Sequence, residues 1–402
     1  MRQSTLKRLL VFCFSFAWFS SPLVVFADAE QLLTCKQQLS LRASEAGISK
    51  PAIDAALSSL QFEQRVLDLD RRQPEFTDTL ANYLSSRVTP ARIEEGRKLM
   101  HTHRRILQQA AERFGVQPQY LVAFWGLETN FGSNLGKIPT LNSLATLACD
   151  ERRSEFFTAE FLEALRLLER GHIEHSAMVG SWAGAMGHTQ FMPSTYMRYA
   201  LDGDGNGLVD LWRSVPDAMF SAANFLNNLG WQRNVRWGRE VKLPKQFDYS
   251  LAGLDRPREL ADWRESGITD ANGKGLPAAD IEAALLVPSG HRGPAFLVYE
   301  NFRVIMRWNR SEYYALSVGL LADAIAGAPG LMKTPPTDLP RLKRDQVLSL
   351  QAALSERGYD VGEHDGVLGP ATRRAVQALQ KVEGTIADGQ VDAGMLKKLG
   401  IE

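Results

Sequence analysis

The residue in this sequence best suited to chemistry is Glu128. It is the only acid in a nearly continuous apolar run that extends from Tyr120 to Gly132. On a helix, Phe124 and Trp125 lie four and three residues before it, on the same side. A carboxyl group held against two aromatic rings is poorly hydrated, which predicts a raised pKa and a proton available for transfer near neutral pH. The alternative is a core helix that ends at the surface, with Glu128 simply solvated in its last turn.

The helix that carries this acid has recognisable ends. Pro118 is typical of a first helical turn, and Gly132 is typical of the residue after a last turn. The apolar residues between them leave little polar face, so we expect the helix to be buried. Before it lies a helical region without a linker, which we expect in the same globular unit. Its helices are predicted over residues 32–46, 50–60 and 90–114.

Two later stretches carry side chains that suit a sugar or peptide ligand. Arg152 and Arg153 precede a helix predicted over residues 161–169, and guanidinium groups bind carboxylates well. Gln190 follows a stretch of small residues that allows close backbone approach. Its amide both donates and accepts hydrogen bonds, which suits a hydroxyl or acetamido group. The alternatives are an exposed basic helix start and a tightly packed turn, and His188 is interpreted as structural.

An acidic loop resembles the EF-hand calcium loop in its spacing. Oxygen ligands occupy positions 1, 3 and 5, with glycine at position 6 and a backbone carbonyl at position 7. Position 12 departs from the pattern, because Arg213 stands where a bidentate glutamate belongs, and Asp217 closes the sphere only if the loop is longer. A calcium-free turn is the alternative. The predicted metal ligands are Asp202, Asp204, Asn206, Leu208, Asp210 and Asp217.

The N-terminus has the features of a secretory signal peptide. Basic residues precede an apolar run over residues 9–18, and small residues predict cleavage after Ala27. An uncleaved anchor is the alternative, although the run is short for a membrane span. Removal of the leader leaves Cys35 and Cys149, an even count that permits a disulfide in an exported chain, with two buried free thiols as the alternative.

Length and composition set broad limits on the class of protein. A chain of 402 residues predicts two or three domains, and 45% apolar with 23% charged residues is ordinary for a soluble globular protein. The formal net charge is zero, so nothing indicates nucleic acid or an acidic membrane surface as a partner.

The second half of the chain changes character twice. From residue 231 to about residue 308, short β-leaning runs alternate with glycine and proline, which predicts a small β-rich insertion. Strands are expected at residues 235–237, 240–243, 284–287 and 296–299, and a helix at 313–325. A proline-rich linker over residues 327–340 follows, and then a compact tail of three short helices separated by Asp-Gly turns.

Several of these stretches, in this order, resemble the B-type lytic murein transglycosylases. The blocks are Glu-Thr-Asn-Phe-Gly at residues 128–132, Gly-Ala-Met-Gly with Gln-Phe-Met-Pro-Ser at 184–194, and Asp-Ala with Ala-Ala-Asn at 217–224. The resemblance covers roughly residues 32–325. Residues 341–399 are similar to the three-helix peptidoglycan-binding domain found beside many cell-wall enzymes.

The resemblance implies an α+β, mostly α architecture. It comprises a lysozyme-like catalytic core with an N-terminal helical region, a small β-rich insertion and a C-terminal three-helix bundle. The implied segments are a signal peptide at 1–27, a catalytic domain at 28–326 with its insertion at about 232–308, the linker at 327–340 and a peptidoglycan-binding domain at 341–402.

The resemblance also implies roles for individual residues. Glu128 is implied as the catalytic acid and then base, with no cofactor for catalysis and a structural Ca²⁺ at most. The family's calcium loop tolerates closure by a later aspartate, which supports Asp217, whereas Arg303 stands where an aromatic residue is half expected. The residues implied to face the glycan groove are Arg152, Arg153, Ser181, Gln190, Tyr299, Asn301 and Tyr314.

The implied reaction cleaves the β-1,4 bond between N-acetylmuramic acid and N-acetylglucosamine without water and leaves a 1,6-anhydro sugar. Ordinary glycosidases place two carboxylates around the bond, and this sequence offers one strong candidate. The implied partners are peptidoglycan strands and other cell-wall enzymes, for a monomer in the periplasm of a Gram-negative envelope. The alternatives are a hydrolytic muramidase, in which Asp150 or Glu155 assists a water, and a non-catalytic wall-binding protein.

Overall fold

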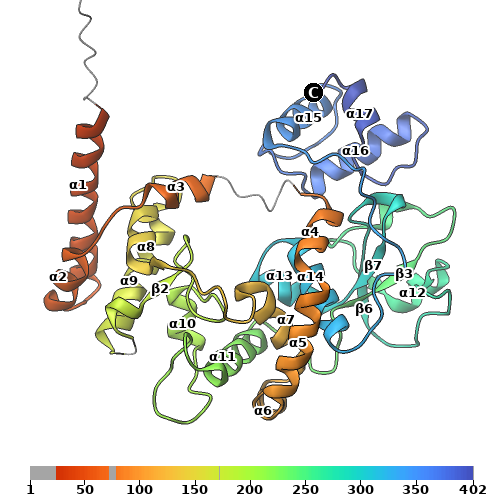
Figure 1. Ribbon diagram of the computed structural model, residues 1–402. Coiled ribbons are helices and arrows are strands. Elements are labelled where there is room, and N and C mark those ends of the chain that lie inside the picture. The colour runs from red at the N-terminus through yellow and green to blue at the C-terminus, as the bar shows by residue number, and fades with distance from the viewer. Residues whose placement is uncertain (1–23, 72–77, 172, 402) are drawn as a thin grey trace, which may run out of the picture.

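The helix that carries Glu128 lies near the middle of the molecule (Figure 1). The computed structural model describes residues 24–71, 78–171 and 173–401. The central helix, α7 (Pro118–Thr129), has Pro118 in its first turn and ends at Asn130 in the left-handed conformation. Nine of its twelve residues are buried. The expected buried helix is therefore confirmed, and the architecture is mostly α with a small sheet.

The helices around α7 form one hydrophobic core with it. Leu121, Phe124 and Phe302 are at most 1% exposed in this core. The expected single helix over residues 90–114 is wrong in one respect, because His103 divides it into two helices that both contact α7. The helices of this core are α4 (Leu80–Arg87), α5 (Pro90–Thr102), α6 (Arg104–Phe114), α11 (Val215–Asn228), α13 (Glu300–Trp308) and α14 (Glu312–Ile325).

A second helical core stands beside the first (Figure 1). Its helices are α1 (Val24–Glu45), α2 (Lys50–Ser58), α3 (Gln64–Arg71), α8 (Thr140–Ala148), α9 (Ser154–Glu169) and α10 (Pro193–Tyr199). Cys35 of α1 and Cys149 after α8 form a disulfide, with their Cα atoms 5.9 Å apart. The predicted signal segment lies outside the described residues up to residue 23, and the predicted cleavage point falls within the first turn of α1. No helix among the described residues is long and apolar enough to cross a membrane.

The sheet of the insertion is antiparallel and five-stranded, in the order β4-β6-β7-β3-β5. Alternate residues face opposite sides, so Phe296 and Val298 join the α7 core while Ala295 and Leu297 pack towards α12 (Leu260–Glu265). The strands are β3 (Gly238–Lys242), β4 (Arg258–Glu259), β5 (Thr269–Asp270), β6 (Glu282–Leu286) and β7 (Ala295–Val298). A separate pair, β1 (Ile138–Pro139) and β2 (Val179–Gly180), lies in the first half of the chain.

The strand expected at residues 235–237 is wrong. Residues 235–237 form no strand, since the pairing with β7 begins at Gly238. Trp237 is fully buried, and its indole donates to the Asp323 carboxylate 3.0 Å away. The last residues of the expected β-rich stretch form α13, whose apolar residues join the α7 core. Strand β7 thereby leads directly into a helix that reaches the site.

The C-terminal tail has its own small core. Its helices are α15 (Arg344–Ser355), α16 (Pro370–Val382) and α17 (Ala393–Lys398), as the sequence predicted. The buried Gln351 and Gln380 side chains each accept a backbone N–H from an Asp-Gly turn, at Gly366 and Gly389 respectively. The tail lies against the insertion, at the top of Figure 1.

Candidate active site

Glu128 lies in the last turn of α7 and is partly exposed, although Leu127 and Thr129 on either side are buried. Two aromatic side chains hold its carboxyl group. The indole Nε1 of Trp308 donates to Oε1 at 2.9 Å, and the hydroxyl of Tyr314 donates to the same oxygen. These donors come from the end of α13 and the first turn of α14, far away in the sequence.

Both donors keep their protons near neutral pH. Burial, reinforced by the neighbouring Glu128 carboxylate, raises the pKa of Tyr314 well above its ordinary value of 10.0. The indole N–H is a donor only. Both groups therefore favour the carboxylate form of Glu128.

An aromatic wall supports these two donors. The ring of Phe124 lies 4.5 Å from that of Trp308 and 6.3 Å from that of Tyr314, centroid to centroid. The sequence correctly placed Phe124 on the side of the acid, whereas Trp308 was missed. Its only signal was a large aromatic residue at the end of a segment that was read as β-rich.

Trp125, the other predicted neighbour, is engaged elsewhere. Its Nε1 donates to Nδ1 of His188 at 3.0 Å, and the two rings meet nearly edge-on. Burial lowers the pKa of His188 below its ordinary value of 6.5, so the ring stays neutral and its Nδ1 can accept. Thr129 Oγ1 also donates to the carbonyl of His188, at 3.1 Å. These contacts fit the interpretation of His188 as structural, since it bonds to two residues of α7, Trp125 and Thr129.

The turn after the acid is conformationally strained. Asn130 and Phe131 have φ values of 48° and 58°, a region that L-residues rarely adopt, and Gly132 follows at 84°. A Cβ at Gly126 would lie 2.8 Å from the ring of Phe131, so any larger residue there would have to displace this ring. Thr129 Oγ1 accepts the backbone N–H of Gly132 at 3.0 Å. The strained turn reverses the chain directly after Glu128, so that the acid ends its helix at the surface.

Gln190 is also in a strained conformation, with φ of 49°. Its side-chain amide donates to the carbonyls of Gly187 at 2.9 Å and Leu135 at 3.4 Å. Ser181 Oγ accepts the backbone N–H of Ala185 at 3.1 Å. These hydrogen bonds to the loop backbone fix the orientation of both side chains. Both side chains are also partly exposed, so a ligand can reach them.

Arg152 and Arg153 contact a buried carboxylate. Asp70 of α3 is 4% exposed and pairs with Arg152, and Arg153 lies 3.7 Å from its other oxygen. A buried carboxylate needs a cation nearby, and this cluster joins α3 to the start of α9. Both arginines therefore have a structural partner, and groove binding by them stays a prediction.

Asn301 and Tyr299 were expected to face the glycan groove, but both side chains are buried. Asn301 is fully buried, and its side-chain amide bonds to backbone groups of Gln232 and Val235 at 2.7–2.9 Å. Tyr299 is 3% exposed and packs in the core on the far side of the sheet, under the guanidinium of Arg239. In this structure neither side chain faces open space, because the β7–α13 connection uses both for packing.

Three acidic residues of the predicted metal loop converge. Asp202, Asp204 and Asp217 each bring one carboxylate oxygen within 4.8 Å of the others. Asp217 is fully buried, and burial raises its pKa. Its two oxygens accept the backbone N–H groups of Gly203 and Asp210, at 2.8 and 2.7 Å. Three carboxylates at this separation repel one another unless a cation lies between them, so the donor set fits Ca²⁺.

The other three predicted calcium ligands, Asp210, Asn206 and Leu208, do not belong to this cluster of carboxylates. Asp210 lies outside the cluster of carboxylates: its Oδ1 accepts the backbone N–H groups of Trp212 and Arg213, both at 2.9 Å. Asp217, and not Asp210, is the third carboxylate of the cluster, and its role as the closing ligand stays a prediction. Asn206 Oδ1 accepts the N–H of Leu208 at 2.8 Å, and cation binding by these two residues stays a prediction.

Comparison with known families matches two segments of the chain. The transglycosylase SLT domain family matches residues 31–323, and the peptidoglycan binding domain family matches residues 343–399. Membrane-bound lytic murein transglycosylase B of Escherichia coli (strain K12) is 33% identical over 253 residues, which are 61% of this chain and 66% of that protein. The chain thus spans slightly less than two thirds of this relative's length.

Solved structures show the same similarity. SltB3 from Pseudomonas aeruginosa, solved in complex with NAG-anhNAM-pentapeptide, is 42% identical with a TM-score of 0.89, covering 92% of this chain and 99% of that chain. The Escherichia coli lytic transglycosylase Slt35, solved in complex with calcium, is 28% identical with a TM-score of 0.63, covering 73% of this chain and 92% of that chain.

Proposed function

The chain belongs to the transglycosylase SLT domain family, and from this membership we propose that it is a lytic murein transglycosylase whose single acid is Glu128. It cleaves the β-1,4 bond between N-acetylmuramic acid and N-acetylglucosamine and leaves a 1,6-anhydro end. The observation that carries the proposal is the position of Glu128, partly exposed at the end of a buried helix and held by Trp308 and Tyr314.

The geometry supports a two-step use of the same carboxyl group. Glu128 first protonates the oxygen of the leaving sugar, and the two donors to its Oε1 stabilise the resulting carboxylate. The substrate's acetamido group stabilises the anomeric centre. Glu128 then takes the proton of the C6 hydroxyl, which attacks the same ring. An intramolecular attack gains from proximity, so no second carboxylate has to position a water.

The acids considered for a hydrolytic alternative are engaged elsewhere. Asp150 pairs with Arg71 at 3.2 Å, and Glu155 accepts two hydrogen bonds from Arg42 at 3.0 and 3.2 Å. Both lie within the second helical core, where these contacts join the end of α8 to α3 and the start of α9 to α1. This pairing favours the lytic reaction over hydrolysis.

We further propose a structural calcium site and an exported, periplasmic location. Asp202, Asp204 and Asp217 would hold the ion, which would neutralise their charge and fix the loop before α11 without taking part in the reaction. Export rests on the N-terminal leader and on the disulfide, which is stable in an oxidising compartment. The C-terminal domain would bind the peptidoglycan strands that the enzyme cleaves.

The proposal is tested by Glu128→Gln, with Glu155→Gln as the matched control. The glutamine retains the shape but has no proton to give, so we expect a loss of turnover of at least about 100-fold, the lower range of general acid–base catalysis. Glycan binding is retained and Glu155→Gln is fully active. Mass spectrometry of digested sacculi identifies the product ends. Free reducing ends would contradict the lytic reaction, and an active Glu128→Gln variant would contradict the acid assignment.

A further inference from the structure

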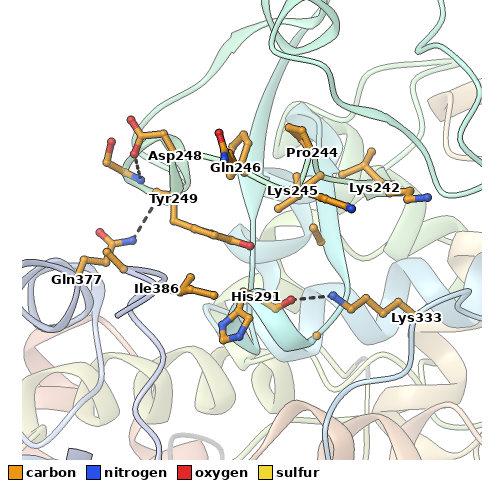
Figure 2. Close-up of a pocket in the computed structure, with 18 of the residues that line it drawn as sticks. Lys242, Pro244, Lys245, Gln246, Asp248, Tyr249, His291, Lys333, Gln377 and Ile386 are labelled. Atoms are coloured by element: carbon orange, nitrogen blue, oxygen red, sulfur yellow. Dashed lines mark hydrogen bonds between the residues drawn. The ribbon is translucent and has the colours of Figure 1, made fainter. Parts of the chain in front are cut away.

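A cleft of about 1090 Å³ lies between the β-rich insertion and the C-terminal domain, away from Glu128. One wall is β3 with the segment after it, and the other is α16 with the turn after it. Figure 2 shows Tyr249, Ile386 and His291 converging on this space. None of the residues discussed for the reaction lines it.

Specific contacts hold the two walls of the cleft together. The Asp388 carboxylate of the C-terminal domain accepts the backbone N–H of His291 at 2.8 Å and meets its Nδ1 at 2.6 Å. Gln377 donates to the carbonyl of Tyr249 at 3.2 Å. A Cβ at Gly290 would collide with the Asp388 carboxylate, so the close approach requires glycine there. Specific contacts between the two domains therefore define the cleft.

The charge of the cleft is strongly positive in a chain of zero formal net charge. Its lining includes six cations against two carboxylates, Glu240 and Asp248. Both oxygens of Glu240 accept hydrogen bonds within the protein, from the backbone N–H groups of Met332 and Lys333 at 2.8 Å. The six cations are Lys242, Lys245, Arg256, Lys333, Arg374 and Lys381.

Among the described residues, five of these six cations form no ion pair, although Arg256 and Lys333 donate to backbone carbonyls. Arg374 pairs with Asp255 at 3.4 Å. The lysines that form ion pairs in the described part of the chain are Lys50, Lys98 and Lys398, all outside the cleft. Lys333 donates to the carbonyl of His291 at 2.8 Å. Lys242, Lys245 and Lys381 form no ion pair in the described part of the chain, so these three lysines remain available for an anionic ligand.

The uncharged part of the lining suggests what kind of anion fits. Phe247 and Tyr249 meet edge to face with centroids 5.4 Å apart, and Ile386 is 50% exposed opposite them. An apolar floor ringed by cations suits a short peptide that has several carboxylates and small apolar side chains. A compact inorganic anion would leave the apolar floor unused.

We propose that this interdomain cleft binds the acidic stem peptide attached to the muramic acid of peptidoglycan. The site is separate from Glu128 and is completed only when both domains are docked. The inference rests on the proposed function, because that function makes the peptide-bearing strand the natural source of such a ligand. It assigns the C-terminal domain and the insertion a joint role in recognising peptide-bearing strands.

The test uses the full chain and a free stem pentapeptide without sugar, measured by isothermal titration calorimetry. The cleft variant is Lys245→Glu with Lys381→Glu, which reverses one charge on each wall. The control is Lys274→Glu with Lys397→Glu, which makes the same change in charge at exposed sites of the same two domains outside the cleft. The same peptide with all carboxylates amidated tests the chemistry of recognition.

We expect the cleft variant to bind the pentapeptide at least about tenfold more weakly than the control, a factor that corresponds to about 1.4 kcal/mol. Raising the salt concentration should weaken binding to the control but hardly affect the cleft variant. Equal affinities of the two variants, undiminished binding of the amidated peptide, or no binding to the unmodified chain at millimolar peptide would each overturn the inference. Anionic phospholipid vesicles or inorganic polyphosphate bound in place of the peptide would do so too.

Failure of this inference is distinguishable from failure of the proposed function. Product ends on bare glycan strands test the reaction of Glu128 and do not require a peptide. Anhydro ends with no peptide binding would reject the cleft and leave the reaction intact. Reducing ends with charge-dependent peptide binding would reject the lytic reaction and leave the cleft intact.

Discussion

Tyr314→Phe removes a hydrogen-bond donor to Glu128 Oε1 and little else. The hydroxyl that is lost donates to the acid, whereas the ring that remains still lies against Phe124. No cavity larger than one oxygen atom is created, and the backbone N–H of Tyr314 stays bonded to Ser311 Oγ. The substitution therefore tests the hydrogen bond rather than the packing of α14.

The size of the effect follows from the charge on the acceptor. A hydrogen bond to a charged group contributes about 1.5–3 kcal/mol. The bond strengthens when Glu128 becomes a carboxylate, so its loss destabilises the state formed as the proton is given up. We expect kcat to fall by about 10- to 100-fold, since each 1.36 kcal/mol is a factor of ten. KM should change little, because the substrate's ground state does not contact this hydroxyl in the proposed scheme.

The pH profile separates this role from a merely structural one. Because the hydroxyl favours the carboxylate over the acid form, its removal should move the basic limb of the kcat profile to higher pH by about one to two units. Tyr313→Phe is the matched control. Its hydroxyl donates to the carbonyl of Pro288 at 3.3 Å, so its loss should lower stability by about 1 kcal/mol and leave the pH profile unchanged. A Tyr314→Phe enzyme with an unaltered profile and a kcat within twofold of the unmodified enzyme would refute the reasoning.

Three further outcomes follow from the fold. Calcium at about 100 times its Kd should stabilise the protein by about 2.7 kcal/mol, and Asp204→Asn should weaken this effect in thermal melts. Burial raises the pKa of Asp217, so without the cation its contribution to stability is present below its ordinary pKa of 3.8 and is lost as pH rises through the folded pKa. Bound calcium should offset this loss. Burial lowers the pKa of His188, so its contribution to the free energy of unfolding is present above its ordinary pKa of 6.5 and is lost as pH falls from there towards the folded pKa. His188→Gln should therefore flatten the dependence of stability on pH, measured by denaturant titrations at several pH values. Replacing Cys35 and Cys149 by serine opens a link between residues 114 positions apart and should cost about 2–5 kcal/mol in a urea titration, with kcat of the folded enzyme unchanged.

Local patterns in the sequence were sufficient to locate the acid and most of its surrounding elements. Glu128 stands out because a buried helix tolerates few charges, and the ends of α7 follow from Pro118 and the turn at Gly132. Asp217 could be expected as the closing residue because its spacing allows a longer loop, and the structure brings it to Asp202 and Asp204. In each case the informative residues lie within one turn or one loop of one another.

The parts that could not be predicted depend on contacts between distant segments. Trp308 reaches Glu128 across 180 positions, and no local pattern encodes that meeting. Trp125 was assigned to the side of the acid because positions three and four residues apart share a helical face. In a helix that is buried on every side, however, neighbouring positions contact different partners, and Trp125 contacts His188. Asn301 looks polar enough for a groove in the sequence, but its buried side chain bonds to backbone groups of Gln232 and Val235.

In the proposed reaction a single acid acts twice, so its carboxyl group has to return to the same position after it has lost its proton. The structure meets this need with two donors that arrive from different directions, Trp308 at the end of α13 and Tyr314 at the start of α14. Rotation of the carboxylate away from them would break both hydrogen bonds, at a cost of about 1.5–3 kcal/mol each. Strand β7 leads into α13, and α13 packs against α14, so the small sheet takes part in fixing the acid although it carries none of the reacting groups. The site therefore depends on an insertion that is remote in the sequence, and a change in the β7–α13 connection at Asn301 would be felt at Glu128 through Trp308.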